Sequence, residues 1–188
     1  MRVAIFGGTF DPIHTAHVRV ALEAADRFQL DRVLFIPSGN PPHKPSNSTT
    51  PYEHRFRMVE LACEADARFE ASRLESGAAK SYSIDTIGKV RAGLPDGAEL
   101  FFLIGADAFA EIGSWHRSAE VLQAVEFVVV SRPGYDYPVP AGARVHRLET
   151  LALVISSSEI RRKLDDGESV AELAPAVLRY IREHRLYE

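Results

Sequence analysis

Two histidines near the start of the chain could act together on a phosphate group. They lie three positions apart in the segment Gly7-Gly8-Thr9-Phe10-Asp11-Pro12-Ile13-His14-Thr15-Ala16-His17. The paired glycines allow the main chain to pass close to a ligand, and a helix that begins near His14 would offer free N–H groups to an anion. Both imidazoles would then project from one face of that helix, near its N-terminus. Donors in this arrangement could stabilise negative charge that develops on a phosphate chain.

The same segment has a structural explanation, in which His14 and His17 only extend an apolar stripe toward the helix start. A His-x-x-His pair alone favours that explanation, because short motifs match by chance. The preceding apolar strand, the double glycine and the helix start reverse this preference. The segment matches neither G-x-G-x-x-G nor G-x-x-x-x-G-K-[ST], so a dinucleotide-binding dehydrogenase and a P-loop enzyme lose their main support.

A second candidate phosphate site lies near the C-terminus, in Ile155-Ser156-Ser157-Ser158-Glu159-Ile160-Arg161. Serine hydroxyls, the free N–H groups of a new helix and an arginine about one turn later could hold the β- and γ-phosphates of a nucleotide. Taken alone, the segment is better explained by an ordinary capping box and a solvated arginine. The chain thus has two junctions at which a strand is followed by a helix start, one with histidines and one with serines and an arginine. Together the two junctions favour phosphate binding.

Both junctions need a fold that places them together, and the rest of the chain predicts one. Short segments rich in Val, Ile and Phe alternate with segments of helical period, which is typical of strands buried on both faces of a sheet. We therefore predict a doubly wound, mostly parallel α/β sheet, in which ligands bind outside the carboxyl ends of the strands. The strands are expected at residues 2–6, 32–36, 68–74, 99–104, 125–130 and 151–155.

Start and stop signals mark the expected helices. Thr50, Pro51 and Glu53 have the types of an N-cap, an N1 proline and a capping-box acid, and Gly167 is expected to end a C-terminal helix. Helices are expected over residues 15–28 and 51–64, and at two Ser-x-x-Glu boxes that begin at Ser156 and Ser169. Prolines and small polar residues predict long loops over residues 37–51 and 132–142.

Composition limits the classes of function. The chain has 188 residues, 22 Lys+Arg against 26 Asp+Glu, a net charge of -4 and 46% hydrophobic residues. This length predicts a single domain over residues 1–188, with helices from about residue 157 packed on it. The acidic balance argues against a nucleic-acid partner, and no apolar run approaches the ~18 residues of a membrane span. The single Cys63 and the lack of a leader before the first strand favour a cytoplasmic location.

The two junctions together resemble the signatures of the nucleotidyltransferase superfamily. Within it, the middle of the chain is similar to the bacterial nicotinate-nucleotide adenylyltransferases. That similarity lies in Pro41-Pro42-His43-Lys44, in Ser81-Tyr82-Ser83-Ile84-Asp85-Thr86 and in Gly105-Ala106-Asp107 followed by Trp115-His116. Two positions depart from the family pattern: Ala16 replaces the glycine of H-x-G-H, and Ser83 replaces a threonine but keeps the hydroxyl.

The resemblance implies a Rossmann-like nucleotidyltransferase domain that joins AMP from ATP to nicotinate mononucleotide, giving deamido-NAD and pyrophosphate. It implies catalytic roles for His14, His17 and Arg161. ATP contacts are implied for Gly7, Gly8, Thr9, Phe10, His14, His17, Gly105, Asp107, Ile155, Ser156, Ser157, Ser158 and Arg161. Contacts to nicotinate mononucleotide are implied for His43, Lys44, Tyr82, Ser83, Thr86 and Trp115.

Without the family match, several of these side chains also have a structural explanation. Trp115 could be core, Asp107 a helix N-cap, and His43 and Lys44 solvated loop residues. Mg²⁺ is expected to arrive with ATP, since the sequence shows no carboxylate cluster for a dedicated metal site.

Other functions remain open at this point. The alternatives are a related adenylyl- or cytidylyltransferase, for example one acting on phosphopantetheine, and a nucleotide-binding module without catalysis. The expected partners are ATP and nicotinate mononucleotide, with no nucleic acid and no membrane, and the sequence leaves a homo-oligomer open.

Overall fold

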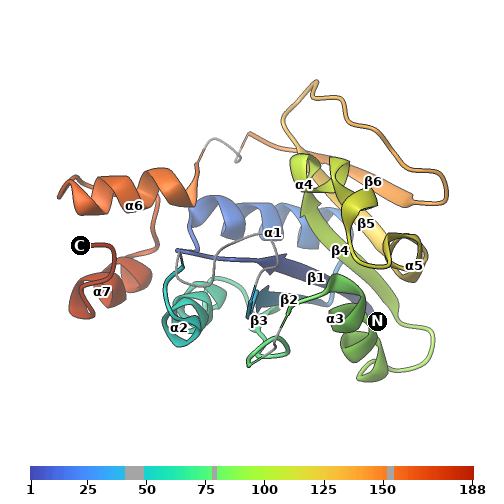
Figure 1. Cartoon of the computed structure of the whole chain (residues 1–188), viewed down its shortest axis with the longest axis horizontal. Helices are drawn as coiled ribbons and strands as arrows, with labels where there is room; N and C mark the ends of the chain where they lie inside the picture. The colour runs from blue at the N-terminus through green and yellow to red at the C-terminus, as the bar shows by residue number, and fades with distance from the viewer. Residues whose placement is uncertain (41–48, 78–79, 152–154) are drawn as a thin grey trace.

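The computed structural model describes residues 1–40, 49–77, 80–151 and 155–188, in which strands and helices alternate (Figure 1). The strands are β1 (Arg2–Gly8), β2 (Arg32–Pro37), β3 (Phe69–Ala71), β4 (Glu99–Gly105), β5 (Glu126–Ser131) and β6 (Arg144–Glu149). The helices are α1 (Thr15–Arg27), α2 (Tyr52–Cys63), α3 (Ser83–Ala92), α4 (Ala106–Ala110), the 3-10 helix η1 (Ile112–Ser114), α5 (Ser118–Ala124), α6 (Ser157–Asp165) and α7 (Pro175–Glu183).

The strands form one six-stranded sheet in the order β3-β2-β1-β4-β5-β6, and all of its pairings are parallel. The chain winds outward from β1 to β3 on one side and from β4 to β6 on the other. The strand order therefore reverses between β1 and β4, and a crevice is expected at their carboxyl ends. The doubly wound α/β fold predicted from the sequence is confirmed.

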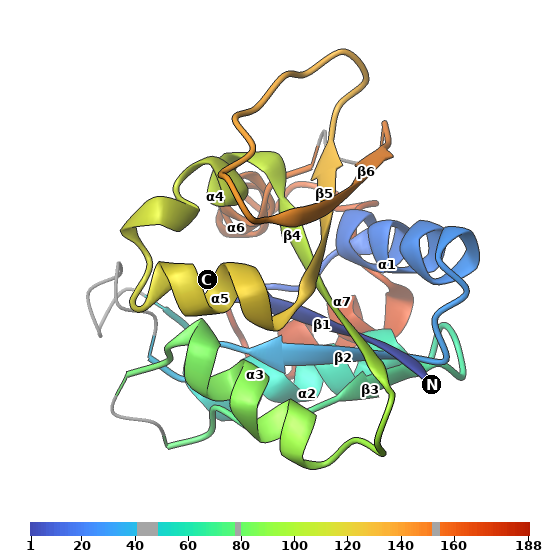
Figure 2. The same ribbon diagram turned by 90° about the vertical axis from the view of Figure 1, so that its right-hand side faces the viewer.

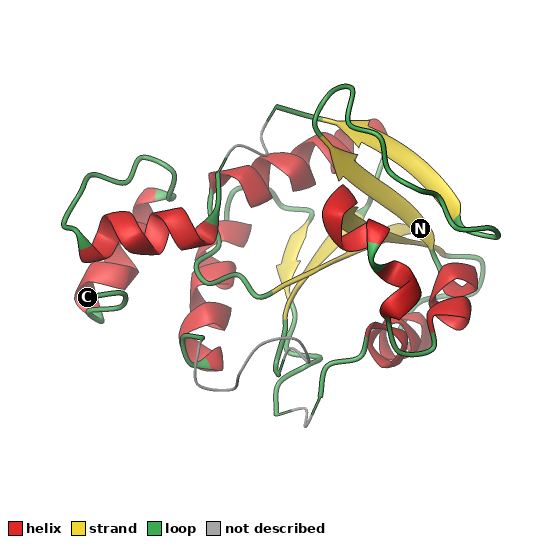
Figure 3. Ribbon diagram, turned by 45° about the horizontal axis from the view of Figure 1, so that its top comes forward, coloured by secondary structure: helices red, strands yellow, loops and turns green. Residues whose placement is uncertain are grey.

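Successive side chains along each strand point to opposite faces of the sheet, so the core has two layers. Ala4 and Phe6 of β1 pack in a cluster with α1 and α2, whereas Val3 and Ile5 pack in a second cluster with α3 and α5. Figure 2 shows these helices on opposite sides of the strands, and Figure 3 shows the strands enclosed between helices. Burial on both faces explains why the central strands have continuous apolar runs in the sequence.

The C-terminal helices pack on the first of these clusters. Ile160 of α6 and Val177 and Ile181 of α7 are buried in it. Figure 1 shows α6 and α7 together at one end of the molecule, beyond α1 and α2. This packing brings the start of α6 to the carboxyl end of β1. None of the helices in the described ranges has the length and apolarity needed to cross a membrane.

Neither described end of the strand predicted at residues 151–155, Leu151 or Ile155, belongs to a strand. The sixth strand is β6, which pairs with β5 at the edge of the sheet, whereas the Leu151 side chain is 77% exposed. Residues 152–154 lie outside the described residues. An edge strand has a partner on one side only and can carry polar side chains, so β6, with Leu148 buried and Arg144 exposed, gave no continuous apolar signal.

Other boundaries differ by a few residues. β3 is shorter than the predicted range of 68–74, while β1, β2, β4 and β5 match their predictions to within two residues. Pro51 is the N-cap of α2 instead of Thr50, and Glu53 pairs with Arg73 on the segment after β3. The tertiary ion pair thus replaces the predicted capping box.

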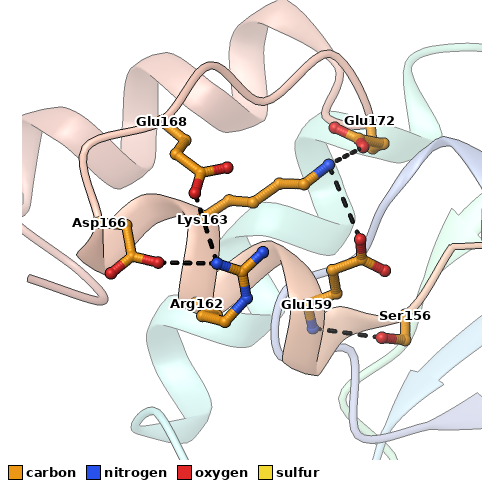
Figure 4. A network of polar contacts seen from close by, with 7 residues as sticks. All are labelled: Ser156, Glu159, Arg162, Lys163, Asp166, Glu168 and Glu172. Atoms are coloured by element: carbon orange, nitrogen blue, oxygen red, sulfur yellow. Dashed lines mark hydrogen bonds and ion pairs between the residues drawn. The ribbon is translucent and has the colours of Figure 1, made fainter.

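Of the two Ser-x-x-Glu capping boxes predicted near the C-terminus, only the first begins a helix. Ser156 caps α6, because its hydroxyl oxygen accepts a hydrogen bond from the Glu159 N–H at 3.2 Å, and Gly167 follows the helix in a left-handed conformation with φ 69°. The helix predicted from Ser169 is wrong: α7 begins at Pro175. Glu172 instead accepts a hydrogen bond from Lys163 at 2.5 Å, within the polar network of Figure 4.

Candidate active site

The loop between β1 and α1 places the two histidines in contact. His14 is the N-cap of α1, and His17 lies in its first turn. Their rings stack with centroids 3.8 Å apart, and the main-chain N–H of His14 donates to Nδ1 of His17 at 3.3 Å. Since Nδ1 accepts, a neutral His17 carries its proton on Nε2 and can donate it to a ligand. Nδ1 of His14 is buried and has no hydrogen-bond partner among the described residues.

Both imidazoles are held in the neutral form. Burial lowers the pKa of His14 to about 4, against an opposing effect of the Glu172 carboxylate. Burial also lowers the pKa of His17 well below its usual value, and His14 adds to this effect. The rings of Phe6 and Phe10 lie edge-on to His17, with centroids at 6.0 and 5.2 Å. The site therefore offers neutral N–H donors at physiological pH instead of imidazolium charges.

The start of α6 is hydrogen-bonded to the loop between β1 and α1, residues 9–14, which we call the histidine loop. The Ser157 hydroxyl donates to the Pro12 carbonyl at 3.0 Å, and Nη1 of Arg161 donates to the Asp11 carbonyl at 2.7 Å. Nη2 of Arg161 donates to the Ser158 hydroxyl oxygen at 3.3 Å. Two segments 145 to 150 residues apart in the sequence are thus joined, and together they carry imidazoles, hydroxyls and a guanidinium.

A cavity of about 560 Å³ opens at the carboxyl ends of β1 and β4, where the strand order reverses. Its volume is within the range usual for small-molecule sites. The segment from Gly7 to Thr9 lines this cavity and leads directly into the histidine loop, so the cavity adjoins that loop along the chain. The predicted phosphate contacts His14, His17 and Arg161 are not in its lining. Predicted site residues in its lining are Gly7, Gly8, Thr9, Tyr82, Ser83, Thr86, Gly105 and Trp115.

Comparison with known proteins agrees with this geometry. A family model described as cytidylyltransferase-like matches residues 5–163. The probable nicotinate-nucleotide adenylyltransferase of Solibacter usitatus is 60% identical over 187 residues and is covered in full, as is this chain. The protein of the same description from Pelobacter propionicus is 43% identical over 213 residues, covering 100% of this chain and 98% of its own.

The chain belongs to the nicotinate-nucleotide adenylyltransferase family. Solved structures extend the agreement to the fold. The Plasmodium falciparum nicotinic acid mononucleotide adenylyltransferase complexed with APC superposes with a TM-score of 0.80 at 20% identity, covering 99% of this chain and 96% of that one. The same protein complexed with NaAD gives a TM-score of 0.81 at 20% identity, covering 99% and 97%.

Two predicted site residues, Tyr82 and Trp115, form an aromatic wall of the cavity. Trp115 is half-buried, lines the cavity and meets Phe102 of β4 edge-on, with centroids 6.0 Å apart. Tyr82 is the N-cap of α3, and its ring lies 4.3 Å from that of His116. Trp115 thus packs partly on the core and also lines the cavity.

Thr86 lines the cavity, and its hydrogen-bonding groups have partners within the protein. Its hydroxyl donates to Oε1 of the buried Glu75 at 2.7 Å, and its main-chain N–H donates to the Tyr82 carbonyl. Both donors are therefore already engaged. The N–H groups of Ser83 and Ile84 belong to the first turn of α3, where a helix has no internal acceptor for them. These two groups are better placed to meet an anionic substrate than Thr86 is.

Several other predicted residues occupy positions that the sequence did not specify. Asp107 is the second residue of α4, capped by Gly105, and its Oδ1 accepts a hydrogen bond from Tyr135 at 2.9 Å. The Phe10 side chain is buried in the core, so only its main chain is available to a ligand. Ile155 packs against the same cluster. His43 and Lys44 lie outside the described residues.

The structure adds polar residues that no motif marked. The Asp11 carboxylate is buried and accepts hydrogen bonds from the Tyr187 hydroxyl at 2.6 Å and the Thr50 N–H at 3.2 Å. Burial and the hydrogen bond to Asp11 raise the pKa of Tyr187, which keeps its phenol protonated as a donor. The segment after α7 therefore helps to hold the histidine loop. A lone tyrosine near the end of a sequence carries no pattern that would have revealed this.

Removing this hydroxyl is expected to destabilise the protein. The Tyr187→Phe variant leaves Oδ1 of the buried Asp11 without its donor, which typically costs about 1–3 kcal/mol of unfolding free energy. Urea denaturation followed by circular dichroism measures the difference. The control is Tyr135→Phe, whose hydroxyl bonds the exposed Asp107 and should change stability by less than about 0.5 kcal/mol. Equal midpoints for Tyr187→Phe and the wild type would show that Asp11 does not depend on this bond.

Proposed function

We propose that this protein transfers AMP from ATP to nicotinate mononucleotide, releasing pyrophosphate and forming deamido-NAD. The observation that carries the proposal is the contact between α6 and the histidine loop, through Ser157 to Pro12 and Arg161 to Asp11, beside a cavity with an aromatic wall. Full-length relatives at 60% and 43% identity, described as probable nicotinate-nucleotide adenylyltransferases, support it.

The proposed chemistry needs positioning and charge stabilisation more than an activated nucleophile. A 5′-phosphate oxygen of the mononucleotide attacks the α-phosphorus of ATP, forming one P–O bond while the bond to the bridging oxygen of pyrophosphate breaks. The nucleophile is already anionic, so no general base is required. This agrees with a site in which the two histidines are neutral donors.

Each part of the described site has a proposed role in that step. Nε2 of His17 would donate to an α-phosphate oxygen, and His14 would help to hold the phosphates. The N-terminus of α6 and Arg161, with Ser157 and Ser158, would hold the departing pyrophosphate, because the positive end of a helix and a guanidinium both attract phosphate. All these groups are fixed before the substrate arrives, so little reorganisation accompanies the reaction.

The cavity is the proposed site for the mononucleotide. Trp115 would stack on the pyridine ring, and the first turn of α3 would meet the nicotinate carboxylate through main-chain N–H groups. His43 and Lys44 stay predicted contacts of the mononucleotide phosphate. We further propose that Mg²⁺ enters as part of MgATP, held mainly by phosphate oxygens, as is usual for this ion. A cytoplasmic location is proposed together with these small soluble substrates.

The acceptor preference is the sharpest test of this proposal. Pyrophosphate release is expected with ATP and nicotinate mononucleotide, and kcat/KM for nicotinamide mononucleotide should be about 10- to 100-fold lower because a charge-assisted hydrogen bond is lost. Phosphopantetheine with ATP, and CTP with either mononucleotide, serve as comparison reactions. Release with phosphopantetheine alone would indicate a different transferase of the superfamily. No release with any pair would leave a nucleotide-binding module.

A further inference from the structure

Arg55 is a buried charged residue that the proposed chemistry does not use. It lies in the first half of α2, it is 1% exposed, and among the described residues it is the largest of the fully buried side chains. Arginine is almost never fully buried without partners. A cation near a helix N-terminus also gains nothing from the helix dipole. The reason for arginine at this position must therefore lie in the groups around its guanidinium.

Those groups are main-chain carbonyls from separate parts of the chain. Nη1 of Arg55 donates to the Thr9 carbonyl at 2.8 Å, Nη2 to the Ser38 carbonyl at 2.9 Å, and Nε to the Thr50 carbonyl at 2.8 Å. Thr9 follows β1 and Ser38 follows β2, and both line the cavity. Thr50 lies just before α2. One planar side chain thus connects the ends of two neighbouring strands with the start of a helix.

The connected segments are also held from other directions. The Ser81 hydroxyl oxygen accepts hydrogen bonds from the Gly39 and Asn40 N–H groups at 3.1 and 3.2 Å. Gly39 passes so close to the Glu75 carbonyl oxygen that a Cβ would lie 1.9 Å from it. The segment that supplies the Ser38 carbonyl is therefore also fixed on the C-terminal side of the guanidinium contact.

Thr50, which Arg55 contacts, is itself linked through Asp11 to Arg161, one of the residues proposed to bind phosphate. The Thr50 N–H donates to the Asp11 carboxylate, while the Asp11 carbonyl accepts from Arg161. Arg55 therefore contacts the cavity wall through Thr9 and Ser38, and through Thr50 it reaches the residue that anchors Arg161. A shift of any of these segments would move the histidine loop relative to the cavity.

We propose that Arg55 is a positioning residue for the adenylyl transfer, which holds the histidine loop and the end of β2 in register by binding the carbonyls of Thr9, Ser38 and Thr50. The inference rests on the proposed function. Arg55 acts through the main chain of these residues and not on the substrates. Its planar fork presents donors in three directions, whereas the compact ammonium of lysine cannot bind all three carbonyls at once.

The test compares variants that separate charge from geometry. Arg55→Lys keeps the positive charge and loses the fork, and we expect its kcat to fall about tenfold, with kcat/KM falling by a similar factor, since misplaced reacting groups weaken transition-state interactions. Arg57→Lys is the matched control, because Arg57 lies on the same helix with its side chain exposed and pairs with Glu60 at 3.1 Å. Its kcat should stay within twofold of the wild type. Circular dichroism at the assay temperature confirms that each variant is folded.

A second readout distinguishes positioning from general stability. In Arg55→Ala, added guanidinium ion far below denaturing concentrations should restore part of kcat, because it can refill the vacated space with a planar fork. Urea at the same concentration should restore none. A purely structural role would give variants of reduced stability whose folded fraction turns over at the wild-type rate.

The outcomes separate this inference from the proposed function. A wild type that does not turn over ATP and nicotinate mononucleotide overturns both. An active wild type with a folded Arg55→Lys variant of unchanged kcat overturns the inference alone. If Arg55→Lys does not fold, Ser81→Ala, which releases the same segment at Gly39 and Asn40, should lower kcat about threefold. Unchanged turnover in Ser81→Ala would then overturn it.

Discussion

Replacing His17 by alanine is expected to lower kcat about 10²–10³-fold with ATP and nicotinate mononucleotide, while the protein stays folded. His17 is a neutral donor whose Nδ1 accepts from the His14 N–H, so its proton lies on Nε2. Loss of one such fixed donor removes an interaction made mainly with charge in the transition state, and KM should change less than kcat. Steady-state pyrophosphate release measures both constants.

Two further variants make the His17 result interpretable. His17→Gln keeps a side-chain N–H donor and should retain more activity than His17→Ala. His54→Ala removes a histidine that bonds Tyr180 at 2.9 Å, between α2 and α7, and should leave kcat unchanged. A folded His17→Ala variant with a near-normal kcat would assign His17 to packing against Phe6 and Phe10.

The second large effect is expected at Arg161. In Arg161→Met we expect kcat/KM to fall about 10²–10³-fold, because the guanidinium proposed to hold the leaving pyrophosphate is lost. The variant also leaves the Asp11 carbonyl without its donor at 2.7 Å, so the unfolding free energy should fall by about 1–3 kcal/mol. Arg161→Lys keeps the charge and should recover only part of the activity, since the two-pronged contact to Asp11 and Ser158 is lost.

The neighbouring residue provides a matched control. Arg162 belongs to the polar network of Figure 4, where it pairs with Asp166 at 2.8 Å and Glu168 at 3.4 Å. Arg162→Met removes the same charge from the same helix, one position along, and kcat/KM should stay within twofold of the wild type. Equal losses in the two variants would mean that Arg161 acts only through the net charge of α6.

The site shows how an acidic chain can bind polyanionic substrates. The net charge is -4, yet the described site consists of helix N-termini, neutral imidazoles, hydroxyls and the guanidinium of Arg161. Main-chain N–H groups attract phosphate without adding formal charge. Local placement of donors, and not a basic surface, is what the proposed reaction requires.

Patterns within the sequence predicted the elements that are buried on both faces. The strands at residues 2–6, 32–36, 99–104 and 125–130 were found because each is a continuous apolar run. β6 was missed because it is a polar edge strand, and the helix expected at Ser169 failed because Glu172 is used in a tertiary contact with Lys163. Local signals are reliable where burial decides the residue types and weak where distant partners do.

The motifs around His14 and Arg161 were recognisable because each is a short, local arrangement of a strand end and a helix start. Neither motif predicts that the two segments are in contact, because Pro12 and Ser157 come together only when the whole sheet has formed. The supporting roles of Arg55 and Tyr187 could not be predicted from the sequence for the same reason. Arg55 binds main-chain carbonyls and Tyr187 binds a carboxylate, and these groups lie on loops elsewhere in the chain.

By itself the sequence determined the fold class and the identity of the chemical groups, because hydrophobic periodicity and helix-start residues act over a few neighbouring positions. Only the tertiary structure decided which donors and acceptors are engaged within the protein and which remain for substrate. In the folded protein, Thr86 is hydrogen-bonded to Glu75 and Asp107 to Tyr135, and burial lowers the pKa of both histidines so that they are neutral. These outcomes depend on desolvation and on hydrogen-bond partners from other elements, which exist only once the chain has folded.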